Sequence, residues 1–149
     1  MAPLVALERM NWKNGLGLCS LLLGLSPATW AHHSYAMFDH AHKVNVTGTV
    51  AKVEWSNPHI FIWMYVPDRT QSSGYSLYAL ESGSVNLLLR QGWVRDTVRV
   101  GEKLSVDYYP LKDGRNGGAF IQATHSDGSV SVGDRTANQI IDATAGGTR

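Results

Sequence analysis

The stretch KVNVTGTVAKVEW, residues 43–55, constrains the fold of this chain most strongly. It is rich in β-branched residues, and its apolar and polar positions roughly alternate, which is typical of a β-strand with one buried face. Gly48 lies in the interior of this long strand. A glycine inside a strand marks a bend or a bulge, the means by which a small barrel turns a corner. The stretch therefore favours a curved, all-β domain.

The rest of the chain adds four strands and one short helix. Pro58 ends the first strand because it lacks an amide donor, and Ser84 and Gly92 are suited to begin and end a helix. The predicted order is strand 43–55, strand 59–66, strand 75–81, helix within 84–92, strand 103–109 and strand 119–126. This order predicts an all-β fold with one short helix, a small OB-fold-like five-stranded barrel. An open β-sandwich is the alternative architecture.

The first 31 residues have the features of a signal peptide. Arg9 and Lys13 precede the apolar run GLGLCSLLLGL, residues 15–25, which is too short to span a bilayer comfortably. Small residues follow, so we expect cleavage after Ala31, with cleavage after Ala28 as the alternative. The chain is therefore predicted to be periplasmic or secreted and not to span the membrane after processing.

The remaining chain divides into a barrel domain at 32–128 and a flexible C-terminal tail at 129–149, because the sequence becomes small and polar after Gly128. The only cysteine, Cys19, lies in the predicted signal peptide, which excludes an intramolecular disulfide. The formal net charge is +1, with acids and bases interspersed. Nucleic acid is therefore not an expected partner, since phosphate binding needs clustered Lys and Arg.

Two adjacent histidines follow the predicted cleavage point. If the mature chain begins at His32, its amine and imidazole can chelate one metal ion, and His33 or His59 can supply the next nitrogen. Tetragonal nitrogen ligands suit Cu(II), so copper is the expected cofactor. In the alternative interpretation the pair is a solvated linker. His40 and His42 are interpreted as exposed linker positions.

His59 opens the second strand, directly after the Asn57–Pro58 break. If the second and third strands form a hairpin, residues near 59 lie opposite residues near 81, so Glu81 should lie close to His59. A carboxylate orients an imidazole and determines which nitrogen is free, as a metal site requires. The alternative is a structural hydrogen bond that fixes the loop between the first two strands.

Tryptophan side chains offer a second kind of site. Trp55, Trp63 and Trp93 are most simply core or rim aromatics, but with Asn57 they also form a candidate surface for a ligand or a periplasmic protein partner. The leading hypothesis is an exported binding module that holds copper, and the alternative is a cofactor-free module for protein interaction or small-ligand binding. We find no convincing nucleophile, so no enzymatic activity is assigned.

Four segments together resemble one known family. They are HHSYAMFD, TGTVAKVEWSNPH, LYALESGSVNLLLRQGW with RDTVRVGEKLSV, and LKDGRNGGAF. The chain resembles the exported bacterial family of unknown function DUF6152 from about His32 to Gly128. Such proteins often have a tryptophan where this chain has Tyr78. The resemblance implies an exported domain with these boundaries, and it implies no reaction.

Overall fold

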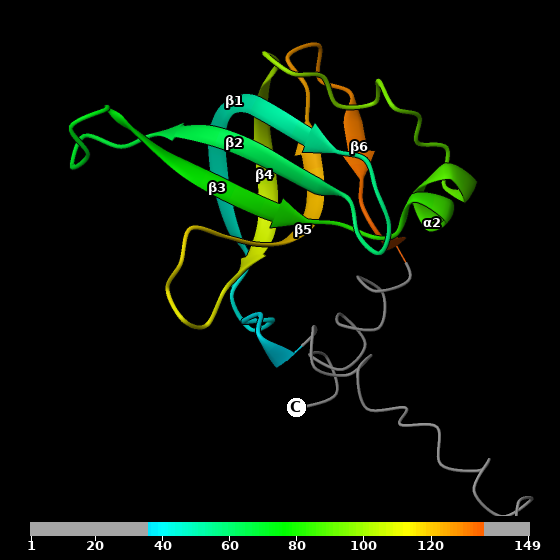
Figure 1. Ribbon diagram of the computed structural model, residues 1–149, viewed down its shortest axis with the longest axis horizontal. Helices are drawn as coiled ribbons and strands as arrows, with labels where there is room; N and C mark the ends of the chain where they lie inside the picture. The colour runs from blue at the N-terminus through cyan, green and yellow to red at the C-terminus, as the bar shows by residue number, and fades with distance from the viewer. Residues whose placement is uncertain (1–35, 136–149) are drawn as a thin grey trace, which may run out of the picture. The chain divides into compact units, whose positions relative to one another are not determined.

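The computed structural model describes residues 36–135 (Figure 1). These residues form six strands and one short helix. The elements are β1 (Val44–Glu54), β2 (Phe61–Pro67), β3 (Tyr75–Glu81), α2 (Val85–Arg90), β4 (Lys103–Pro110), β5 (Gly117–Thr124) and β6 (Val130–Val132). Each predicted strand is present, with ends that differ by at most two residues from the sequence expectation. The predicted signal peptide, His32 and His33 lie outside the described residues.

The strands form a closed barrel. Neighbouring strands follow the order β3-β2-β1-β4-β5-β6, and an additional pairing of β3 with β5 closes the first five strands. The β3–β5 pairing is parallel and runs from Ala79–Gly117 to Glu81–Ala119, whereas the other pairings are antiparallel. This is the topology of an OB-fold-like barrel. The predicted fold class is confirmed, and the open sandwich does not apply because the sheet is closed.

The first strand turns the corner that Gly48 predicted. Its first half pairs with β4 and its second half with β2, and Thr49 has a partner in both strands. A Cβ atom on Gly48 would lie 2.5 Å from the carbonyl oxygen of Tyr65, so glycine is needed here for a close approach of β2. The irregularity in the ladder falls slightly later, between Val50 and Lys52. The bend and the bulge are therefore adjacent, separate features of β1.

The core fills the barrel with aliphatic side chains that alternate along the strands. The largest fully buried side chains are Val50, Ile60, Ile62, Met64, Leu80, Leu88, Leu104 and Val106. A smaller apolar cluster of Phe38, Tyr109 and Ile121 lies apart from this core. Strand alternation therefore leaves the intervening residues of β2, starting with Phe61, on the outer face of the barrel.

The helix α2 begins and ends as its sequence predicts. The Ser84 side chain accepts a hydrogen bond from the backbone N–H of Leu87 at 3.4 Å, which caps the first turn. Gly92 has a φ of +94°, which suits a residue that follows a helix. Leu88 is fully buried and holds the helix against the core. No helix among residues 36–135 is long and apolar enough to cross a membrane.

The start of the predicted tail is wrong, because residues 129–135 continue the fold. Strand β6 pairs with β5 through Val130, Ser131 and Val132. The indole N–H of Trp93 donates to the carbonyl oxygen of Val132 at 2.7 Å. A strand as short as β6 forms because β5 has a free edge with which it can pair. The indole N–H of Trp93 also needs an acceptor, which Val132 supplies. The rest of the predicted tail, residues 136–149, lies outside the described residues.

Candidate functional site: a histidine–glutamate pair

The structure brings His59 and Glu81 together, as the hairpin pairing of β2 and β3 predicts. Phe61 pairs with Glu81 across the two strands, and His59 lies two residues before Phe61. The Nδ1 atom of His59 lies 2.5 Å from Oε1 of Glu81. The side chain of His59 is 37% exposed and that of Glu81 is 18% exposed. The pair is therefore held by the barrel but remains open to solvent on the histidine side.

Backbone hydrogen bonds fix the segment that carries His59. The N–H of Ile60 donates to the carbonyl oxygen of Gly83 at 3.1 Å, and the N–H of Ser82 donates to the carbonyl oxygen of Ile60 at 2.8 Å. These bonds continue the β2–β3 pairing past the ends of both strands. The positions of His59 and Glu81 are thus set by the sheet.

The loop before His59 is tied to the helix. The Asn57 side-chain oxygen accepts a hydrogen bond from the backbone N–H of Val85, the first residue of α2, at 3.2 Å. The peptide bond between Asn57 and Pro58 is cis. Asn57 thus anchors the loop through its side chain, and this is the contact that the structure assigns to it.

Burial and the contact with His59 have opposite effects on the pKa of the Glu81 carboxyl group. Burial raises the pKa of the Glu81 carboxyl group, and the neighbouring His59 only partly offsets this effect. Since Nδ1 of His59 faces the carboxyl group, the neutral imidazole presents Nε2 as its basic nitrogen. A carboxylate on one ring nitrogen is the arrangement that orients a metal-binding histidine.

The remaining histidines near the N-terminus have different surroundings. Nδ1 of His42 lies 2.7 Å from Oδ2 of Asp39, and its side chain is 73% exposed, as expected for a linker. The expectation of exposure is wrong for His40, which is half-buried because its ring packs on Tyr109 with the centroids 5.0 Å apart. Among the described residues, no group of three or more His, Cys, Asp or Glu side chains could hold a metal ion.

The three tryptophans do not form one surface. Trp55 is half-buried and packs against the core, and Trp63 is half-buried on the outer side of β2. Trp93 is only 4% exposed, and its ring meets Phe120 edge-on at 5.8 Å. The prediction that Trp93 belongs to a ligand or partner surface is therefore wrong, because its ring fills the space beside α2 and its N–H is used by Val132.

Sequence reasoning missed a second histidine–glutamate pair. Nδ1 of His125 lies 2.6 Å from Oε1 of Glu102, and Nε2 lies 2.8 Å from the hydroxyl oxygen of Ser131. Burial opposes ionisation of Glu102, but hydrogen bonds from His125 and from the Arg99 backbone N–H outweigh it and lower the pKa of Glu102. The network joins the start of β4 to the β5–β6 hairpin and borders a polar cavity of about 300 Å³. No local pattern signals it, because the partners come together only when the barrel forms.

These features define a class of protein: a small closed barrel of the OB-fold type that presents an oriented histidine beside a half-buried carboxyl group. A family model described as "Family of unknown function (DUF6152)" matches residues 20–122, and the chain belongs to this family. The matched residues include the His32–His33 pair as well as His59 and Glu81. No curated protein and no solved structure matches the chain.

Proposed function

We propose that this protein is an exported binding module that holds copper, with His59 as a ligand and with Glu81 as the residue that orients it. The observation that carries the proposal is the 2.5 Å contact between Nδ1 of His59 and Oε1 of Glu81. This contact directs the basic Nε2 atom away from the carboxyl group. The remaining ligands are the amine and imidazole of His32 and the imidazole of His33, which lie outside the described residues.

The donor chemistry supports copper over other metals. Imidazole and amine nitrogens in a tetragonal arrangement suit Cu(II), which also heads the affinity order of the divalent first-row metals. Thiolate ligands are excluded from the mature chain because Cys19 falls in the proposed signal peptide. Export through that peptide delivers the protein to the periplasm or to the exterior, where it carries or buffers the metal.

Glu81 acts through His59 in this proposal. Removing a hydrogen-bonding partner of a metal-ligating histidine typically costs about 10–100-fold in metal affinity. Glu81→Gln is therefore expected to weaken Cu(II) binding by at least about tenfold. The chain offers a matched control in Glu102→Gln, which removes the same charge from the other histidine–glutamate pair and should leave Cu(II) affinity unchanged.

The test is a Cu(II) titration of protein that a bacterial host has exported and processed, with the intact mass recording the N-terminus. We expect a mass that begins at His32 and one tight copper ion per chain. His32→Ala combined with His33→Ala should abolish tight binding, and His59→Ala should weaken it strongly. The exposed His42→Ala is the histidine control and should bind as the unmodified chain does. A chain that begins at Thr29, or a double variant that binds copper undiminished, would contradict the proposal.

A further inference from the structure

The outer face of β2 and β3 carries a row of half-buried and exposed aromatic and apolar side chains, apart from the histidine–glutamate pair. Ile62 and Met64 are fully buried, so their neighbours Phe61, Trp63 and Tyr65 point to the opposite side of β2. This face continues on β3, where Tyr75 is 53% and Leu77 is 46% exposed, and Tyr65 is 51% exposed. Contiguous exposed groups of this kind usually mark a binding surface.

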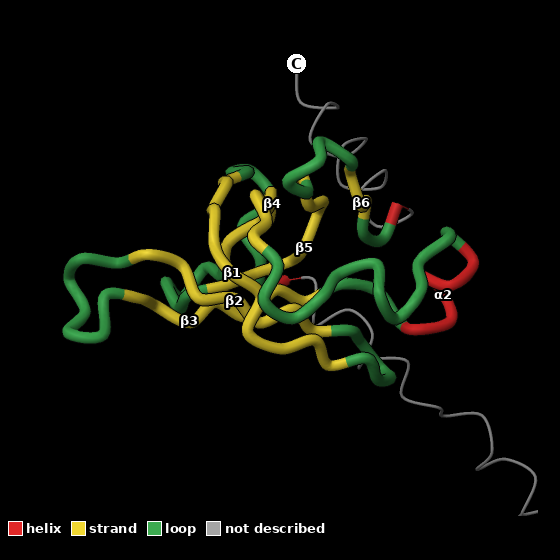
Figure 2. Tube along the Cα trace, turned by 90° about the horizontal axis from the view of Figure 1, so that it is seen from above, coloured by secondary structure: helices red, strands yellow, loops and turns green. Residues whose placement is uncertain are grey.

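The rings are spaced along the strands. The centroids of Phe61 and Trp63 lie 6.4 Å apart, and those of Tyr65 and Tyr75 lie 6.5 Å apart. The hairpin that bears Tyr65 and Tyr75 reaches beyond the barrel in both views (Figures 1 and 2), so the far end of the face is open to solvent. The face thus carries aromatic rings at the successive outward positions of β2 and at Tyr75 of β3.

Two adjoining hollows follow this face. The first has a volume of about 460 Å³ and is lined by Thr49, Tyr65, Ser73, Tyr75 and Leu77. The second has a volume of about 410 Å³ and is lined by Ala51, Lys52, Glu54, Trp63, Tyr65 and Leu77. They share Tyr65 and Leu77, so together they form one groove, which we call the hairpin groove.

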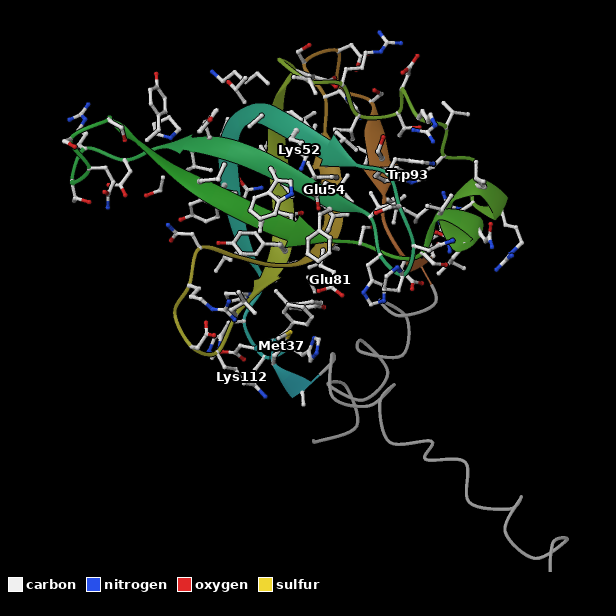
Figure 3. All side chains as sticks on the ribbon, in the orientation of Figure 1. Met37, Lys52, Glu54, Glu81, Trp93 and Lys112 are labelled. Atoms are coloured by element: carbon white, nitrogen blue, oxygen red, sulfur yellow. The ribbon has the colours of Figure 1, made fainter. Side chains whose placement is uncertain are left out.

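The hairpin groove is electrically neutral. Its only charged side chains, Lys52 and Glu54, form an ion pair with each other on β1, where Figure 3 shows them side by side. The hydrogen bond from Lys52 is the main cause that lowers the pKa of Glu54, which favours the carboxylate form of that side chain. A phosphate polymer needs clustered cations and is disfavoured here. The hairpin groove instead offers hydrogen-bonding side chains without net charge, namely Thr49, Ser73 and the Lys52–Glu54 pair.

We propose that the hairpin groove binds a neutral oligosaccharide. The apolar faces of successive sugar rings would stack on Trp63, Tyr65 and Tyr75, and the sugar hydroxyl groups would meet Thr49, Ser73 and the Lys52–Glu54 pair. The outer face over the second and third strands is the surface on which OB-folds take oligonucleotides and oligosaccharides, and the neutral charge selects the latter. An interface with a second copy of the chain is disfavoured, because the centre of a protein–protein interface is usually depleted in charged residues such as Lys52 and Glu54.

The experiment uses affinity gel electrophoresis of the mature protein, with EDTA present so that copper has no influence. The probes are soluble neutral polysaccharides: a β-1,4-glucan, an α-1,4-glucan and a mannan. We expect at least one to retard the protein, and Tyr65→Ala combined with Tyr75→Ala to weaken this binding at least tenfold. Val100→Ala, at a 67% exposed position outside the groove, is the control and should bind as the unmodified chain does.

Three results would overturn the sugar-binding proposal. The first is that no neutral polysaccharide retards the protein, and the second is that the double tyrosine variant is retarded as strongly as the unmodified chain. The third is a dimer in light-scattering measurements that the same variant dissociates, since the groove would then be an interface between two copies. Because the substituted tyrosines are exposed, unchanged circular dichroism should show that the variant is folded. Loss of copper binding in the His59 variant leaves this proposal untouched.

Discussion

Substituting Gly117 with alanine should open the barrel where β3 and β5 meet. A Cβ atom on Gly117 would lie 2.1 Å from the carbonyl oxygen of Ala79, its partner in the parallel pairing. Its φ of +128° is also a conformation that side chains disfavour. The backbone strain costs about 1–3 kcal/mol, and the forced shift of a packed strand costs about 1–3 kcal/mol more. We therefore expect the free energy of unfolding to fall by about 2–6 kcal/mol.

The matched control for this prediction lies in the loop between β4 and β5, three residues before Gly117. Gly114 has a φ of +79°, but a Cβ atom there would meet nothing within 4 Å. Gly114→Ala therefore retains the backbone strain and lacks the collision, so it should cost only about 1–2 kcal/mol. Urea denaturation followed by circular dichroism gives both free energies by linear extrapolation. Equal losses in the two variants would refute the inference that steric closure of the barrel requires Gly117.

Three further predictions concern stability. Since the pKa of Glu102 is lowered on folding, its stabilising contribution is present above the unfolded value near 4.5 and is lost as the pH falls through the folded value. In thermal melts recorded at a series of pH values, Glu102→Gln should reduce the loss of stability at acid pH. An unchanged loss of stability would argue against this role of Glu102. Trp93→Phe removes the hydrogen bond to Val132 and should cost about 1 kcal/mol in urea denaturation, whereas no loss would show that water replaces the bond. Ser84→Ala removes the helix cap and should cost about 1 kcal/mol by the same assay, and a neutral result would contradict the capping role.

Most of the barrel follows from local sequence patterns. The alternation in residues 43–55 and the interior Gly48 predict a bent first strand, because the bend places one strand against two partners. Ser84 and Gly92 mark the helix through the conformations that helix ends require. The register of the β2–β3 hairpin is set by its loop, so the proximity of His59 and Glu81 could be predicted before any coordinates.

The features that escaped prediction depend on long-range contacts. Strand β6 has three residues and is stabilised by β5 and by the Trp93 indole, which no local pattern reveals. Trp93 itself is buried directly after the helix, where its backbone N–H donates to the carbonyl oxygen of Leu88. His125 and Glu102 are 23 residues apart and meet only because β4 and β5 pair. Such contacts are products of barrel closure.

The central claim is that His59 is a copper ligand, and pulsed EPR of the Cu(II)-loaded mature protein tests it most directly. This method counts the imidazole rings on copper through their remote nitrogens. The measurement compares the unmodified chain with His59→Ala at equal copper loading. We predict that the variant loses the signal of one imidazole while the signals of the N-terminal pair remain. An unchanged number of imidazole nitrogens would contradict the account and would leave His59 and Glu81 as a structural pair.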